Sequence, residues 1–176
     1  MKKSVLLLFF AGCVATGIFG IGRKIPMNRV NDLGQREGYW RDSLGEGITH
    51  ELYYKGGKKD GLYKRFYRNK LFLFGEYTAD NMSGTWYMFG DEGELRCTID
   101  SIELNKDSIY TGYCQIFCKY KCYCSDYYPS GAVKSEGYMV CDEDFMVDFW
   151  EIGEWKYYDE SGNLIKTKDY GDRRTP

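Results

Sequence analysis

Proline and histidine are scarce in this sequence, with only three prolines and one histidine among 176 residues. So few prolines exclude a proline-rich disordered chain and a collagen-like one. The single histidine, His50, has no second imidazole to join it in a metal site or a proton relay, and we interpret it as a substitute for an aromatic residue. The formal net charge is only −2, which gives no reason to expect nucleic-acid binding, because that needs clustered Lys and Arg.

Glycine and aromatic residues are abundant. The chain has 21 glycines, and 18% of its residues are aromatic, including 17 tyrosines. Glycine provides the positive φ angles that tight turns need, and aromatic side chains suit the pleated surface of a sheet. The composition therefore predicts an all-β protein of strands separated by tight turns and argues against a helical bundle.

Residues 1–22 are typical of an export signal. Two lysines precede an uncharged run from Val5 to Gly22, a pattern that directs a chain to the secretion machinery. Three outcomes stay open: lipid attachment at Cys13 as in a bacterial lipoprotein, cleavage near residues 15–17, or an uncleaved anchor helix. We expect an exported protein, periplasmic or at the cell surface, in which 23–35 is a linker.

Six cysteines follow the leader, and an even number in an exported chain is compatible with disulfides. They are Cys97, Cys114, Cys118, Cys122, Cys124 and Cys141. If 113–124 is extended, the four cysteines within it share one face, and neighbours two residues apart are too distant for a disulfide. We therefore expect disulfides or buried thiols between strands, with Cys97 and Cys141 as partners. The spacing has no C-x-x-C pair, so we predict no metal site and no cofactor.

A short pattern recurs along the chain. Gly61-x-Tyr63 is followed 23 residues later by Gly84-x-Trp86, and Gly153-x-Trp155 has the same form. Each copy precedes a second aromatic residue and, as a rule, a turn that contains glycine, so each predicts a β-hairpin. The leading glycine marks a bend or a close backbone approach. Because one hairpin is only marginally stable, successive hairpins are expected to lie side by side in one extended sheet.

These repeats resemble the bacterial variant of the MORN repeat, with the pattern Gly-x-Trp-x-x-Tyr-Tyr-x-x-Gly. The best matches are 61–70, 84–93 and 153–162. The resemblance implies antiparallel hairpins in an elongated twisted sheet over 36–170, with an irregular cysteine-rich middle at 100–126 and an exposed tail at 171–176. It also implies scaffold or protein-interaction work. Some bacterial relatives carry an antitoxin label, and lipid association has been proposed for eukaryotic members.

The residues favour binding over catalysis. The acidic pairs lie in expected turns, and the chain has no glycine-rich phosphate loop, so we predict that it is not an enzyme. We expect an envelope-associated module that recognises a protein or an envelope polymer through exposed aromatic side chains. The candidates are Trp40, Tyr54, Tyr63, Tyr87, Trp150 and Tyr158. Two alternatives stay open: an antitoxin or immunity protein that neutralises a toxin, and an enzyme acting on envelope material.

The leader makes a prediction about the mature protein. After fractionation of the producing bacterium, the chain should be in the envelope or periplasmic fraction. Its intact mass should distinguish a lipidated Cys13, a cleaved chain and an uncleaved anchor. A variant lacking residues 1–22 is the control and should stay in the cytosol. Finding the unprocessed full-length chain in the cytosolic fraction would contradict the prediction.

Overall fold

The computed structural model describes residues 26–106, 110–111, 116–142 and 149–171. Within these ranges the chain forms β-strands and no helix, which confirms the all-β prediction. No helix in the described part is long and apolar enough to cross a membrane. The leader 1–22 with Cys13, and also Cys114, lie outside the described residues.

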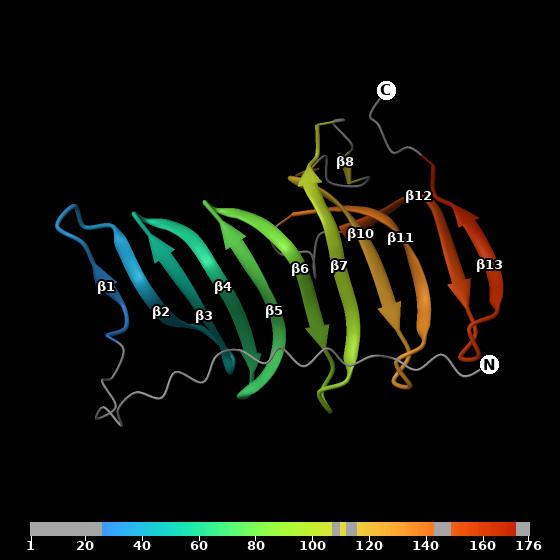
Figure 1. Ribbon diagram of the computed structural model, residues 1–176, viewed down its shortest axis with the longest axis horizontal. Coiled ribbons are helices and arrows are strands. Elements are labelled where there is room, and N and C mark those ends of the chain that lie inside the picture. Colours follow the sequence, from blue (N-terminus) through green and yellow to red (C-terminus); the bar gives the residue numbers. More distant parts are fainter. Residues whose placement is uncertain (1–25, 107–109, 112–115, 143–148, 172–176) are drawn as a thin grey trace, which may run out of the picture.

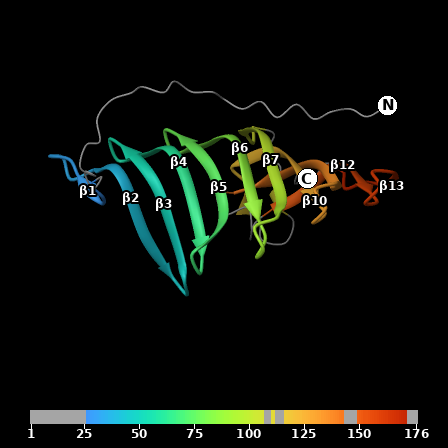
Figure 2. The same cartoon turned by 60° about the horizontal axis from the view of Figure 1, so that its bottom comes forward.

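Eleven strands form one open antiparallel sheet in chain order, from β1 through β7 and then β10 to β13 (Figures 1 and 2). They are β1 (Arg29–Val30), β2 (Arg36–Gly45), β3 (Ile48–Lys55), β4 (Lys58–Tyr67), β5 (Lys70–Thr78), β6 (Asn81–Phe89), β7 (Leu95–Leu104), β10 (Tyr120–Tyr127), β11 (Val133–Cys141), β12 (Phe149–Tyr158) and β13 (Leu164–Asp169). A separate pair, β8 (Tyr110–Thr111) and β9 (Ile116–Phe117), lies between β7 and β10 in the chain. Each long strand pairs with its sequence neighbour, so the predicted hairpin sheet is confirmed.

Two kinds of turn connect the strands. The turns from β2 to β6 have two-residue loops, and both loop residues have positive φ, as type I′ hairpins require. Arg68 and Asn69 adopt this conformation without a glycine, with φ of 47° and 64°. A five-residue turn recurs at 31–35, 90–94, 128–132 and 159–163, with the same pair of backbone hydrogen bonds and a glycine in fourth place. The last three of these turns line one end of the sheet (Figure 1).

The glycine of each Gly-x-aromatic pattern produces a bulge. Gly84 and Gly153 have φ of 65° and 60°, and the strand register shifts beside each of them. An added Cβ would meet no atom within 3.4 Å at either position, so these glycines are required by backbone conformation rather than by space. Gly38, 23 residues before Gly61, also has positive φ and precedes Trp40, which adds a copy at the N-terminal end.

The bulges at Gly84 and Gly153 each place a tryptophan over a glycine of the preceding strand. A Cβ on Gly75 would lie 2.1 Å from the ring of Trp86, and one on Gly137 would lie 2.5 Å from the ring of Trp155. Both tryptophans are almost fully buried, at 1% and 4% exposure. The equivalent environments of Trp86 and Trp155 are what the repeat pattern predicts.

The core is a row of side chains on one face of the single sheet, which we call the tryptophan face. Register pairs place its members opposite one another from strand to strand. They are Trp40, Leu52, Tyr63, Gly75, Trp86, Ile99, Cys124, Gly137 and Trp155. Ring contacts link neighbouring members, as between Tyr63 and Trp86 at 5.5 Å between centroids. Cross-strand packing along this row therefore buries the apolar side chains that a second layer would otherwise cover.

The cysteine-rich middle departs from one expectation. Cys122 and Cys124 share the tryptophan face, as predicted. Cys118 does not, because it packs with Val140 and Ile152. Met139 belongs to the main core, so its strand neighbour Val140, and Cys118 with it, lie on the opposite face. The chain bends between β9 and β10, so strand alternation does not continue from Cys122 back to Cys118. Strand β1 also lies inside the predicted linker 23–35, where it pairs with β2.

The close approach of tryptophan to glycine can be tested by adding one methyl group. Gly137→Ala and Gly75→Ala should each lower the free energy of unfolding by about 1–3 kcal/mol, because the buried indole must move. Urea unfolding followed by tryptophan fluorescence measures this change. In a Trp86→Ala background, Gly75→Ala should cost much less. Equal costs in both backgrounds would show that the indole is not what excludes the methyl group.

Candidate functional site

The six predicted aromatic residues do not come together in one place. Trp40, Tyr54 and Tyr63 lie on the tryptophan face, where Tyr54 and Tyr63 are buried in the core. The other three lie on the opposite face. Tyr87 packs beside Phe74, Trp150 packs against the Val140 cluster, and Tyr158 donates a hydrogen bond to Glu136 at 2.7 Å. A single aromatic surface made of all six is therefore not what the strands build.

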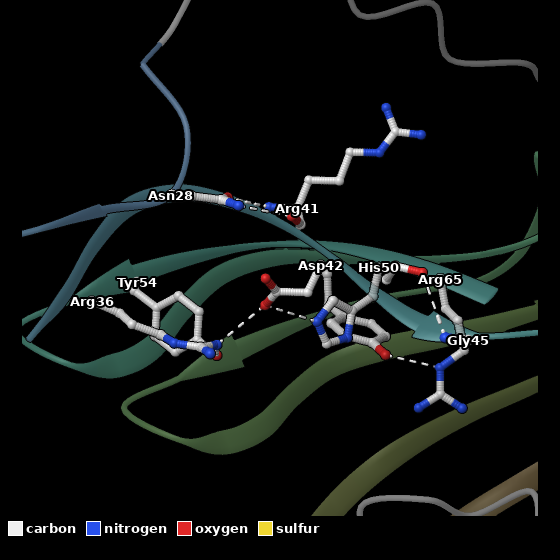
Figure 3. A network of polar contacts seen from close by, with 10 residues as sticks. Asn28, Arg36, Arg41, Asp42, Gly45, His50, Tyr54 and Arg65 are labelled. Carbon is white, nitrogen blue, oxygen red and sulfur yellow. Dashed lines mark hydrogen bonds and ion pairs between the residues drawn. The ribbon is translucent and has the colours of Figure 1, made fainter. Parts of the chain in front are cut away.

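The N-terminal end of the tryptophan face carries a polar network (Figure 3). Asp42 on β2 lies directly opposite His50 on β3, and their Oδ2 and Nε2 atoms are 3.3 Å apart. Arg36 Nη1 donates to the same Oδ2 at 3.2 Å and to the Tyr54 hydroxyl at 2.9 Å. The guanidinium also lies over the ring of Trp40, 4.5 Å from its centroid.

His50 in this network fits the interpretation of a residue that replaces an aromatic one. Its ring lies 5.9 Å from that of Tyr63 in an edge arrangement, within the row of rings. Its carboxylate partner Asp42 is shared with Arg36, so the network ties β2 to β3. Sequence reasoning identified the histidine but missed Asp42 and Arg36, because only the β2–β3 register brings them to it.

A cavity of about 340 Å³ lies on the tryptophan face toward the C-terminal end. Strands β6, β7, β10, β11 and β12 all contribute to its lining. The lining residues are Met88, Cys97, Ile99, Cys124, Asp126, Lys134, Ser135, Met139, Phe149, Glu151, Trp155 and Tyr157. Apolar walls with a few polar groups are the usual character of a ligand site. None of the six predicted aromatic residues lines this cavity.

Cysteines form two close thiol pairs across strands. Cys97 Sγ and Cys124 Sγ are 3.2 Å apart, and Cys122 Sγ and Cys141 Sγ are 3.6 Å apart. Cys97 and Cys141 thus each lie beside a cysteine of a neighbouring strand, as free, buried thiols, which is one of the two states expected from the sequence. Hydrogen bonding to the partner thiol, together with burial, raises the pKa of Cys122 and of Cys124 above the ordinary range of a thiol. Cys122 and Cys124 are therefore neutral at physiological pH.

Tyrosines on the opposite face have raised pKa values. Burial, with a hydrogen bond to Glu51, raises the pKa of Tyr39 to about 12. Burial, with the nearby charge of Glu136, raises the pKa of Tyr123 to about 12. The ring of Tyr123 also packs edge-on against Tyr138, at 5.1 Å between centroids. The folded state therefore holds these phenols in their neutral form.

No family model, curated protein or solved structure matches this chain.

The two raised tyrosine pKa values predict a loss of stability in alkali. An unfolded tyrosine ionises near pH 10, whereas these folded ones ionise near pH 12. Their contribution is complete below pH 10 and is lost between about pH 10 and 12, because the unfolded state releases its protons first. Tyr39→Phe and Tyr123→Phe should each reduce the fall in the urea midpoint between pH 8 and pH 11. Exposed Tyr67→Phe is the control, and an equal effect there would contradict the prediction.

Proposed function

We propose that this chain is an exported, non-catalytic interaction module that binds a protein or a polymer of the bacterial cell envelope. The observation that carries the proposal is the cavity on the tryptophan face. It lies over strands β6, β7 and β10 to β12 and has Phe149, Trp155 and Tyr157 in its walls. Aromatic walls can stack on a sugar ring or receive an apolar side chain, while Asp126 and Glu151 can accept hydrogen bonds.

The shape of the sheet supports binding of an extended partner. Eleven strands in one layer give a long surface, with one edge at β1 and the other at β13. Every residue of β13 is exposed, including Leu164 and Ile165 at 55% and 64%. Phe149 at the cavity is 44% exposed. Apolar groups thus stand in solvent at the same end of the sheet as the cavity, as a partner surface requires.

The repeat pattern supports the same class of function. The resemblance to MORN-repeat variants implies scaffold work, and the hairpin sheet is the fold that such repeats build. The export signal predicted for 1–22 would bring the module to the envelope. The polar network around His50 supports a structural role for the only imidazole, because it packs among aromatic rings.

Retention on isolated envelopes tests the proposal. The chain should be retained, and Phe149→Ala and Glu151→Gln should each weaken retention about tenfold, as expected for a group central to an interface. Tyr67→Ala, which removes another exposed aromatic side chain from β4 at the other half of the sheet, is the matched control and should bind like the wild type. Retention on protease-treated envelopes would indicate a polymer, and its loss would indicate a protein. Equal retention of all variants would refute the cavity as the binding surface.

A further inference from the structure

The strand register brings three ligand-type side chains together on the floor of the cavity. Cys97 on β7 lies directly opposite Asp126 on β10. Cys124 is two residues before Asp126 on the same strand, so both point to the tryptophan face. The two Sγ atoms are 3.2 Å apart, and both lie within 4.8 Å of a carboxylate oxygen of Asp126. Within the described part of the chain, this is the one such group that could surround an ion.

The surroundings of this group suit a ligand site. Both thiols are buried, at 4% and 5% exposure, yet both line the cavity, so an ion can reach them from solvent. Buried Ser135, opposite Asp126 on β11, donates its hydroxyl to Asp126 Oδ2 at 2.8 Å. A hydrogen bond of this kind orients a ligating carboxylate and is a regular part of metal sites in proteins.

We propose that Cys97, Cys124 and Asp126 bind one Zn²⁺ ion, with the fourth ligand position open to the cavity. Two sulfurs and one carboxylate oxygen form a mixed set that suits this borderline-soft ion, and three protein ligands leave one position of the tetrahedron for water or another donor. The ion joins two thiols and one carboxylate, and two protons leave to solvent as the thiols become thiolates. One negative charge remains on the site.

Disulfide formation is the competing fate of the same two thiols. A disulfide between Cys97 and Cys124 would form by exchange with an oxidised dithiol, which would be reduced in turn. That bond has no need of Asp126, whereas a bound ion does. Removing the Asp126 carboxylate therefore distinguishes a bound ion from a disulfide. The zinc proposal does not depend on the function proposed above.

Zinc binding to the reduced full chain, measured without oxygen in competition with a chromogenic chelator, tests the site. The wild type should bind one Zn²⁺ per chain. Cys97→Ser and Cys124→Ser should abolish binding, and Asp126→Asn should weaken it about 10- to 100-fold. Cys122→Ser removes a buried thiol of the other pair, and Phe149→Ala removes a wall of the cavity; both controls should bind Zn²⁺ like the wild type.

Cadmium gives a second readout, which reports the thiolate ligands directly. Cd²⁺ should produce an ultraviolet thiolate charge-transfer band in the wild type and in Cys122→Ser, and no such band in Cys97→Ser. If the serine variants fail to fold, Asp126→Asn still tests the proposal, because its weaker metal binding can be followed through the cadmium band. Three results would overturn the proposal: no saturable binding, equal binding by Asp126→Asn and the wild type, or a mapped Cys97–Cys124 disulfide in the protein as it is isolated from cells.

Discussion

The packing of an indole over a glycine in the neighbouring strand is the constraint on which this sheet depends. A single layer has no second sheet to cover its apolar face, so the face must bury itself by contacts between neighbouring strands. Trp86 and Trp155 do this by occupying the space that a side chain at Gly75 and Gly137 would fill. The bulge beside each tryptophan re-aims its side chain, and the register of the strands on either side follows from that fit.

Much of this architecture could be predicted from local patterns. The Gly-x-aromatic copies marked the strands that contain bulges, and glycines in fourth place marked the five-residue turns. Gly75 and Gly137 were not singled out, because their role appears only when the facing strand is in place. The turn at Arg68 and Asn69 was equally hidden, since it reaches positive φ without glycine.

The candidate site shows where sequence reasoning ends. Alternation along a strand correctly placed Cys122 and Cys124 together, but it extended too far when it included Cys118, because a bend intervenes. Alternation relates residues within one strand only. It therefore could not predict whether aromatic residues on different strands share a face. Asp126 beside Cys97 and Asp42 beside His50 are cross-strand neighbours. Such pairs depend on the strand register. The bulges shift this register by amounts that cannot be read from the sequence.

The nearest-neighbour order of the strands has a consequence for synthesis on the ribosome. Each hairpin finds its partner in the segment made just before it, so the sheet can grow from the N-terminal edge as the chain emerges. The longest delay between the synthesis of two pairing strands is that between β7 and β10, because the intervening segment must be made before they can pair. The Cys97 thiol on β7 stays without its partner Cys124 on β10 during that interval, so this is the stage at which the nascent chain is most open to mispairing with other thiols.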